Sequence, residues 1–242
     1  MFGRIAGVYD LLNHILSLGI DRSWRRELAN IMPSGSLLDL AAGTLDVSIA
    51  LAKTKPESRI LAIDFCFPML AKGIRKTQNS SIEASIMPVA GDATSLPLPD
   101  ACMDGISIAF GIRNIPMRQQ AYAEMLRVLK PGGKACILEF GSAAERILGG
   151  VYNVYLAMLL PSIGRVIAGD KTAYSYLSRT IREFPSAKTL ENEMRQAGFI
   201  NTGFKKLTGG IVCLHWGENS RKHTEQKEKD QSSNQGSNAQ GA

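Results

Sequence analysis

The sequence has few cysteines, and their spacing serves no recognisable structural purpose. Four occur among 242 residues, at Cys66, Cys102, Cys136 and Cys213, with no CxxC pair and no histidine close by. That spacing fits neither a zinc site nor a disulfide framework. We therefore expect no bound metal and a reduced, cytoplasmic setting.

Long hydrophobic runs are also missing. The most apolar stretch, residues 151–167, is interrupted by Asn153, Pro161 and Arg165, so it is too short and too broken to span a bilayer. The first ten residues lack the apolar core and the small-residue cleavage site of a signal peptide. We predict neither a membrane-spanning helix nor an exported precursor.

Neither sign of charge is scarce, although basic residues are in excess. The chain has 28 Lys and Arg against 22 Asp and Glu, a net charge of +6, with 45% apolar and 21% charged residues. This composition excludes a wholly disordered, collagen-like or coiled-coil chain, and the length suits one domain with extensions. Residues 1–217 are predicted to form that domain, and residues 218–242 a disordered polar tail.

Strand-like runs alternate with helical ones through the middle of the chain. Alternation of this kind predicts an α/β fold with a doubly wound, mostly parallel sheet. A turn at Lys130–Gly133 ends the third of these helices. Residues 145–197 are expected to be a helical insertion, followed by a hairpin that turns at Thr208–Gly210 and completes a seven-stranded, Rossmann-like sheet. The predicted strands cover 37–41, 59–64, 86–91, 103–110, 135–140, 200–207 and 211–216, and the helices 47–53, 68–77 and 119–129.

Polar residues follow the predicted strands at the ends where such sheets bind ligands. Gly43 turns the chain after the first strand, Asp64 ends the second, and Asp92 and Ala93 follow the third. A glycine turn with a carboxylate at the tip of the next strand is typical of ribose binding, because the carboxylate accepts hydrogen bonds from two hydroxyl groups.

The glycines that cradle phosphates are missing from this turn. Leu45 and Ser48 occupy the second and third glycine positions of G-x-G-x-x-G, and the chain has no GxxxxGK[ST] loop. The acidic Asp39 and Asp46 would repel phosphate but suit a cation or an amine. S-adenosylmethionine is such a ligand, with Asp92 and its neighbour placed to read the adenine. These signals together predict a methyltransferase.

Longer motifs carry a family resemblance. They comprise YDLLNHILSLGIDRSWR at 9–25, RNIP at 113–116, RVLKPGG at 127–133, the run from Gly169-Asp170 to Tyr176-Leu177, and TGGIV at 208–212. With these motifs the chain resembles the demethylmenaquinone and ubiquinone-biosynthesis C-methyltransferases, a class I S-adenosylmethionine-dependent family, from about residue 2 to 217.

The resemblance implies a reaction and a set of cofactor contacts. Thr44, Asp64, Asp92 and Ala93 are implied to contact S-adenosylmethionine. The implied reaction is transfer of its methyl group to a ring carbon of a prenylated quinol in quinone biosynthesis. The expected substrate is demethylmenaquinol, favoured by the lack of a long presequence. The alternative is the ubiquinone precursor 2-polyprenyl-6-methoxy-1,4-benzoquinol.

Two positions depart from the family pattern. The family usually has Gly-Thr-Gly-Asp where this chain has Gly-Thr-Leu45-Asp, and some members have serine at the position of Ala109. If the backbone at Leu45 is left-handed, leucine costs about 1–2 kcal/mol there. We expect its side chain either to crowd the methionine end of the cofactor and weaken cofactor binding, or to shift the loop.

The proposed chemistry needs a group that stabilises the quinol anion and a group that takes a proton. Arg113, which stays protonated, suits the first role, with Asn114 orienting the ring. Tyr9 is predicted to close over the substrate and relay the proton, and residues 1–31 to form a helical cap. Alternatives remain open: a salt-bridge role for Arg113 and a packing role for Tyr9. His14 and His215 are expected to be packed or exposed rather than catalytic.

The prenyl tail of such a substrate implies contact with a membrane surface. Aromatic and apolar residues at 152–160 lie next to a basic region, which predicts a peripheral site on the inner face of the cell membrane. A buried or dimer-forming helix is the alternative, so a homodimer stays open. An RNA methyltransferase is disfavoured because no stacking aromatics accompany the basic residues, and no nucleic-acid partner is expected. A non-catalytic scaffold in a quinone-synthesis assembly is the remaining alternative.

Overall fold

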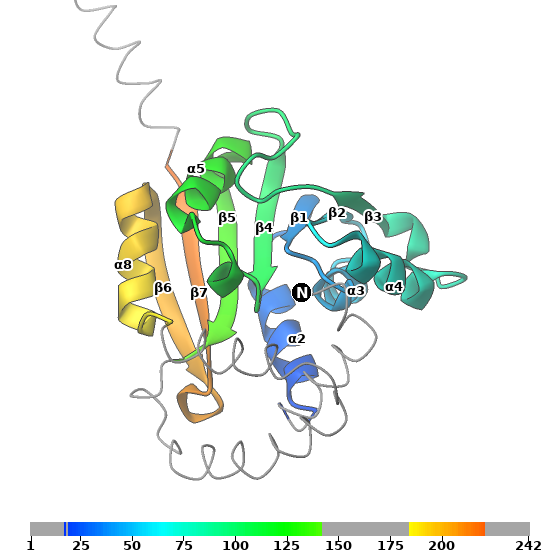
Figure 1. Cartoon of the computed structure of the whole chain (residues 1–242), viewed down its shortest axis with the longest axis horizontal. Helices are drawn as coiled ribbons and strands as arrows, with labels where there is room; N and C mark the ends of the chain where they lie inside the picture. The colour runs from blue at the N-terminus through cyan, green and yellow to red at the C-terminus, as the bar shows by residue number, and fades with distance from the viewer. Residues whose placement is uncertain (1–16, 18, 142–183, 221–242) are drawn as a thin grey trace, which may run out of the picture.

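A computed structural model describes residues 17, 19–141 and 184–220 of the chain. The described elements alternate between strands and helices, as the sequence predicts (Figure 1). In chain order they are α2 (Asp21–Ile31), β1 (Ser36–Leu40), α3 (Asp46–Thr54), β2 (Arg59–Asp64), α4 (Phe67–Thr77), β3 (Ile86–Ala90), β4 (Met103–Ala109), α5 (Arg118–Val128), β5 (Leu129–Phe140), α8 (Ala187–Ala197), β6 (Phe199–Leu207) and β7 (Val212–Asn219). Short 3-10 turns are η1 (Glu83–Ser85), η2 (Ile112–Asn114) and η4 (Thr208–Gly210).

The strands form one seven-stranded sheet in the order β3-β2-β1-β4-β5-β7-β6. Neighbours among β1 to β5 are parallel, whereas β7 is antiparallel to both β5 and β6. The strand order reverses between β1 and β4, so their carboxyl ends meet where α/β sheets bind ligands. The predicted fold class and the closing hairpin are confirmed.

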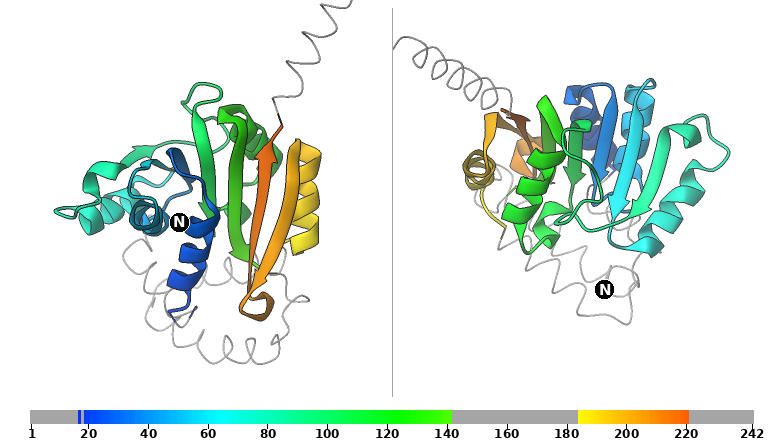
Figure 2. Two further views of the ribbon diagram at one scale, coloured as in Figure 1. Left: turned by 180° about the vertical axis from the view of Figure 1, so that it is seen from behind. Right: turned by 90° about the horizontal axis from the view of Figure 1, so that it is seen from above.

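Helices cover both faces of this sheet (Figure 2). One core joins α2, α3 and α4 to the sheet, with Leu28, Leu51 and Leu70 from these helices almost fully buried. A second core lies under α5 and α8, where Met125 and Leu190 are fully buried. Both faces of β1 and β4 are buried, so the polar residues within them, Asp39 and Ser107, are buried as well.

The insertion predicted at 145–197 is described only at its end. Residues 142–183 lie outside the described part of the chain, whereas α8 is the predicted helical structure. Ser186 caps its N-terminus by accepting a hydrogen bond from the N–H of Thr189 (3.1 Å), and Gly198 follows its C-terminus with φ 112°. Both are the residue types that favour helix ends.

Two boundaries differ from the prediction. The predicted turn Lys130–Gly133 lies inside β5 as a bulge: β4 advances from Met103 to Gly105 while β5 advances from Leu129 to Lys134. The antiparallel strand β7 also continues to Asn219, two residues past the predicted domain end. Asn219 Nδ2 donates to the carbonyls of Leu126 and Leu129 (3.1 and 2.7 Å), which fixes this end of the strand.

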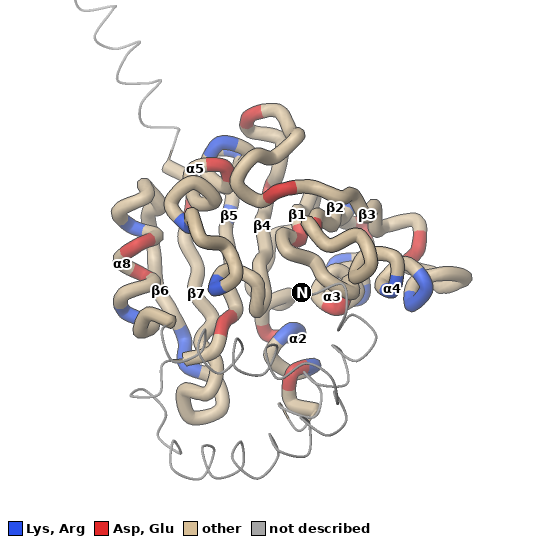
Figure 3. The backbone as a smooth tube through the Cα atoms, in the orientation of Figure 1, with Lys and Arg blue, Asp and Glu red and all other residues tan. Residues whose placement is uncertain are grey.

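Three predictions concern residues outside the described part: the helices before residue 17, the 152–160 patch and the tail from residue 221. Within the described part, no helix has the length and apolar content needed to cross a bilayer. Acidic and basic residues are interspersed on α2 and α8 (Figure 3), and most of the charges on α8 take part in ion pairs.

Candidate functional site

A cavity of about 360 Å³ opens at the carboxyl ends of β1, β2, β3 and β4. This volume is within the usual range for small-molecule sites. Its position is the one predicted from the strand ends. The residues that line it are Leu40, Ala41, Gly43, Ile63–Cys66, Met69, Gly91–Thr94, Ala109–Gly111 and Asn114–Met117.

Asp64 is fixed at the mouth of this cavity by two backbone donors. The N–H of Gly43 donates to Oδ2 (2.8 Å), and the N–H of Cys66 donates to Oδ1 (2.7 Å). Gly43 makes its bond with φ +55°, a left-handed angle that favours glycine. Burial raises the pKa of Asp64 above its ordinary value, and the two backbone donors oppose that rise. Each oxygen keeps a free lone pair, so the carboxylate can still accept from two hydroxyl groups of a ribose.

Leu45 adopts the left-handed backbone that the family glycine would have, with φ 65° and ψ 19°. Its side chain is fully buried in the core beneath α3 and α4 and lines neither cavity of the site. Gly73 on α4 leaves room for it, because a Cβ at that position would overlap Leu45 Cγ. The expectation that Leu45 crowds the methionine end of the cofactor is therefore wrong.

Asp92 and Ala93 both line the main cavity beyond β3. Asp92 Oδ1 accepts from the N–H and the hydroxyl of Thr94, both at 2.8 Å. These two donors fix the carboxylate within its turn and leave Oδ2 available to an exocyclic amine. The geometry is compatible with the predicted adenine contact.

A second, smaller cavity of about 30 Å³ is lined by the loop that follows β1. It shares Ala41, Gly43, Ala109 and Phe110 with the main cavity, so the two compartments are adjacent. The other residues that line it are Arg25, Asp39, Ala42, Thr44, Asp46 and Val47. Thr44 lines this compartment and not the main one. The polar groups of the site are therefore divided between a nucleoside-sized space and a small charged one.

Asp39 is the buried acid of the small compartment. Its oxygens accept hydrogen bonds from Ser48 Oγ (2.6 Å) and Ser107 Oγ (3.1 Å). Burial raises the pKa of Asp39 to about 6, although these hydroxyl groups lower it. A neighbouring ammonium group would favour the ionised carboxylate. Asp39 therefore fits the prediction of a site for a cation or an amine.

Phe110 lines both compartments and holds an unusual conformation. Its φ of 55° is left-handed, which is rare for a bulky side chain. The N–H of Phe110 donates to the carbonyl of Leu138 (2.8 Å), and its ring packs against that of Phe140 at 4.9 Å between centroids. Strain of this kind is concentrated at functional sites. The sequence analysis gave Phe110 no role in the site, because the identity of a residue does not reveal its backbone angles.

The two predicted residues Arg113 and Asn114 lie in different places: Asn114 at the cavity and Arg113 in the interior. Asn114 lines the main cavity, and its Nδ2 donates to the carbonyl of Phe110 (3.4 Å). Arg113 instead forms an ion pair with Glu139 at the end of β5, with side chains 4% and 1% exposed. Its guanidinium also lies 5.3 Å from the centroid of the Phe140 ring. The salt-bridge alternative for Arg113 is the arrangement observed.

This buried pair is incompletely hydrogen-bonded. Among the described residues, Arg113 Nε and Glu139 Oε2 are buried without a hydrogen-bond partner. Burial raises the pKa of Glu139, and the nearby Arg113 charge opposes that rise. The sequence analysis gave Glu139 no role. Leaving polar atoms unpaired is costly, so this pair lowers the stability of the fold by more than a fully hydrogen-bonded pair would.

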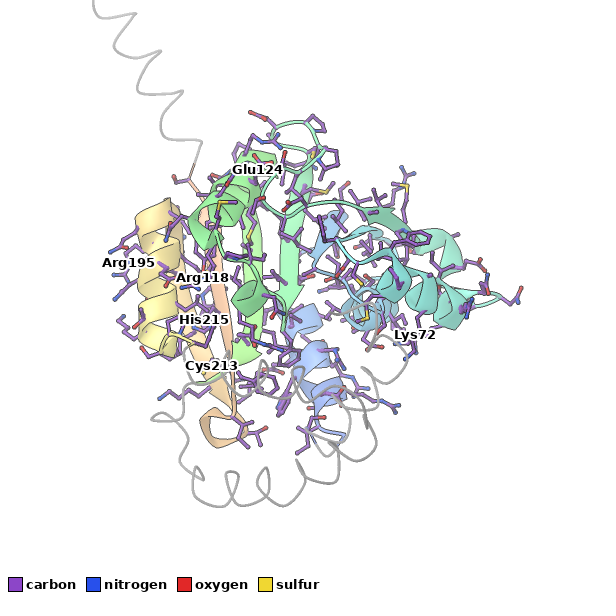
Figure 4. The ribbon with its side chains drawn as sticks, in the orientation of Figure 1. Lys72, Arg118, Glu124, Arg195, Cys213 and His215 are labelled. Carbon is purple, nitrogen blue, oxygen red and sulfur yellow. The ribbon has the colours of Figure 1, made fainter. Side chains whose placement is uncertain are left out.

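The remaining candidates lie elsewhere. Tyr9 and His14 are outside the described residues. His215 is buried on β7 under α8, where its Nε2 lies 3.0 Å from the carbonyl oxygen of Ala187. In Figure 4 it lies on the opposite side of the molecule from Lys72 on α4, the helix that borders the cavity. The packed role expected for His215 is confirmed.

Together the two compartments fit S-adenosylmethionine. A carboxylate with backbone support faces the nucleoside space, and acidic and basic side chains share the space next to it. Gly43 lines both compartments.

Comparison with known proteins gives a consistent result. A family model described as the ubiE/COQ5 methyltransferase family matches residues 1–219. The ubiquinone/menaquinone biosynthesis C-methyltransferase UbiE of Marinomonas sp. (strain MWYL1) is 38% identical over 221 residues, covering 90% of this chain and 88% of that protein. The protein of the same name from Geobacter sulfurreducens is 39% identical over 226 residues, covering 92% and 88%.

A solved structure shows the same fold at much lower identity. A SAM dependent methyltransferase from Aquifex aeolicus has a TM-score of 0.59 and 17% identity, covering 82% of this chain and 89% of that chain. At this identity the likeness concerns the fold alone.

Proposed function

The chain belongs to the ubiE/COQ5 methyltransferase family, and from that premise we propose that it transfers a methyl group to a ring carbon of demethylmenaquinol. It is an S-adenosylmethionine-dependent C-methyltransferase of the UbiE type, which serves ubiquinone and menaquinone biosynthesis. Of the two ring systems, we propose the naphthoquinol as the substrate and the methoxybenzoquinol as the alternative.

The observation that carries the proposal is the support of Asp64 by the N–H groups of Gly43 and Cys66. A carboxylate held in this way faces a cavity of nucleoside size and accepts the ribose hydroxyl groups. We assign Asp92 and Ala93 to the adenine and Thr44 to the amino-acid end of the cofactor. When bound, the cofactor supplies a methyl group on a positively charged sulfur, already activated for transfer.

The chain must then place and activate the quinol. A ring carbon gains electron density when the neighbouring hydroxyl ionises, and this carbon forms the new C–C bond as the C–S bond breaks. The ring proton at that carbon leaves afterwards and restores aromaticity. Asn114, which lines the cavity, orients the ring, and we propose that Tyr9 relays the protons to solvent.

Arg113 acts in this scheme through its fixed positive charge. It remains protonated, and Glu139 holds its guanidinium beside the loop that carries Asn114. We propose that this charge stabilises the quinol anion from beneath the site, since the Arg113 side chain is buried and does not line the main cavity. Such a fixed charge acts most strongly in a site that excludes water.

The prenyl tail places the reaction at a membrane surface. We propose peripheral binding to the inner face of the cell membrane through the 152–160 segment, which lies outside the described residues. Flotation with liposomes that contain or lack anionic lipid tests this contact. Binding that needs anionic lipid supports it, and absence of binding to both kinds of liposome contradicts it.

The scaffold alternative has lost its physical argument. It required Leu45 to block the cofactor site, whereas this side chain lies in the core. Calorimetric titration of the wild-type protein with S-adenosylmethionine tests the point directly. Saturable binding excludes a chain that has lost its cofactor.

Quinone extraction from cells tests the substrate. A strain whose own C-methyltransferase gene is deleted would express this chain, with Asp64→Ala as the inactive control. Menaquinone restored without ubiquinone supports demethylmenaquinol as the substrate. Ubiquinone restored alone identifies the alternative, and recovery of neither quinone, with the protein present, contradicts the proposal.

A further inference from the structure

Arg25 is a buried cation that reaches the site from a helix rather than from a strand end. It lies on α2, its side chain is 8% exposed, and it lines the small cavity together with Gly43 and Thr44. Its guanidinium carbon lies 5.9 Å from the centroid of the Phe110 ring. The sequence analysis gave Arg25 no role, because nothing in the helical pattern of α2 indicates that this residue faces a ligand.

The local charges leave part of this guanidinium available. Arg25 Nη1 donates to Asp21 Oδ2 within α2. Nη2 lies 3.8 Å from Asp46 Oδ2, a distance that allows electrostatic attraction but is too long for a hydrogen bond. Asp46 is also engaged by Lys76, whose Nζ lies 2.8 Å from Oδ1. The guanidinium is therefore held in place by one carboxylate while Nη2 can still donate to another acceptor.

The cavity contains both signs of charge, which restricts the ligand. Arg25 can bind a carboxylate, whereas Asp39, which lines the same cavity, suits an ammonium group. A phosphate would be repelled by Asp39 and Asp46 together. The arrangement matches a zwitterionic amino-acid group, in which a carboxylate and an ammonium group share one carbon.

From this geometry we infer that Arg25 binds the carboxylate of the amino-acid part of S-adenosylmethionine and thereby selects the complete cofactor over nucleosides that lack it. The inference rests on the proposed function, because it assumes that the nucleoside occupies the main cavity. Arginine is well suited to this role, since its planar fork can donate two parallel hydrogen bonds to a carboxylate.

The position of α2 gives the inference a structural consequence. Trp24 Nε1 donates to Thr208 Oγ1 at the β6–β7 turn (2.8 Å), and Lys205 on β6 pairs with Glu27. These contacts hold α2 against the hairpin before any ligand binds. Arg25 therefore needs little rearrangement to receive the carboxylate, and the N-terminal part of the chain becomes part of the cofactor site.

Binding of three ligands to matched variants tests this role. S-adenosylhomocysteine carries both the carboxylate and the ammonium group, the decarboxylated cofactor keeps only the ammonium group, and 5′-methylthioadenosine has neither. Arg25→Met is compared by calorimetry with wild type and with Arg26→Met, which changes an exposed arginine on the same helix. Arg25→Lys keeps the charge without the fork.

We expect Arg25→Met to weaken the binding of S-adenosylhomocysteine by about 10- to 100-fold. This is the range for the loss of one hydrogen bond to a charged group. Binding of methylthioadenosine and of the decarboxylated cofactor should change by less than about threefold. Arg25→Lys should lie between Arg25→Met and wild type, and Arg26→Met should match wild type.

Two results would overturn the inference. One is equal weakening of all three ligands by Arg25→Met, which would make Arg25 a purely structural residue. The other is unchanged binding of S-adenosylhomocysteine. Methylthioadenosine also reports whether each variant still has a folded site. A wild-type protein that binds none of the three ligands would instead contradict the proposed function itself.

Discussion

Leu45 gives the sharpest prediction, because sequence and structure lead to opposite expectations. By sequence, replacing it with the family glycine should open the cofactor site and tighten binding. In the structure, Leu45→Gly removes a fully buried side chain from the core. Truncating a buried leucine costs about 2–5 kcal/mol, and relief of the left-handed backbone returns about 1–2 kcal/mol. We expect the free energy of unfolding to fall by about 1–3 kcal/mol.

Comparison with alanine isolates the backbone contribution. Leu45→Ala loses most of the same packing but keeps a Cβ at φ 65°. It should therefore be less stable than Leu45→Gly by about 1 kcal/mol. This reverses the usual order of the two residues inside regular elements. Urea denaturation of the three proteins at one temperature measures both differences.

Gly73 provides the second half of the experiment. A Cβ at this position would overlap Leu45 Cγ and lie 2.8 Å from the backbone carbon of Thr44. Gly73→Ala should therefore cost about 1–3 kcal/mol, the usual range for overpacking. Removing the Leu45 side chain relieves part of that clash. The double variant should be more stable than the sum of the single changes by about 1 kcal/mol or more.

Cofactor affinity completes the test. Because Leu45 lines neither cavity, Leu45→Gly should leave the Kd for S-adenosylhomocysteine within about threefold of wild type. A variant that is more stable than wild type and binds the cofactor at least tenfold more tightly would refute the reasoning. It would mean that the leucine obstructs the site after all.

Three further predictions concern buried carboxylates. Asp39 has a folded-state pKa of about 6 against an ordinary value of 3.8, so the folded protein keeps a proton that the unfolded chain releases. Its contribution to the free energy of unfolding should fall by about 2 kcal/mol from pH 4 to pH 6. Urea melts of Asp39→Asn should lack this component, and identical pH profiles would contradict it. Glu139→Gln leaves buried Arg113 without its counter-charge and should cost about 3–5 kcal/mol. Replacing both residues with apolar ones should recover much of that loss in the same melts, and a fully stable single variant would disprove the pairing. Asp64→Ala should weaken the binding of S-adenosylhomocysteine by at least about 100-fold in calorimetry, because two hydrogen bonds to a charged group are lost. Asp100→Ala, which changes an exposed acid, is the matched control. Equal losses of affinity in the two variants would contradict the assignment of Asp64 to the ribose.

Much of the fold follows from local patterns. The strands β1, β2 and β4 are largely buried and rich in leucine and isoleucine, so composition identifies them. β3 was predicted despite Pro88, which is tolerated because β3 is an edge strand. The bulge at Lys130–Gly133 could not be predicted, because its pairing with β4 depends on residues distant in sequence.

In the candidate site too, some residues could be placed from local sequence, whereas others depend on residues distant in the chain. Gly43, Asp64 and Asp92 could be placed because each follows a strand directly, and parallel strands end at one edge of the sheet. Arg25 and Glu139 depend on tertiary contacts: α2 docks beside the β1 loop, and β5 brings Glu139 under η2. Leu45 was judged by its motif position alone, whereas its side-chain direction depends on Gly73 in another helix.

Transfer of a labelled methyl group tests the central claim most directly. The purified protein would be incubated with methyl-labelled S-adenosylmethionine and chemically reduced demethylmenaquinol in detergent, and the quinone product located by mass spectrometry. The account predicts one label on a ring carbon, lost when Asp64→Ala replaces the wild type. Label on a hydroxyl oxygen, or no transfer to either quinol from a protein that binds the cofactor, would contradict it.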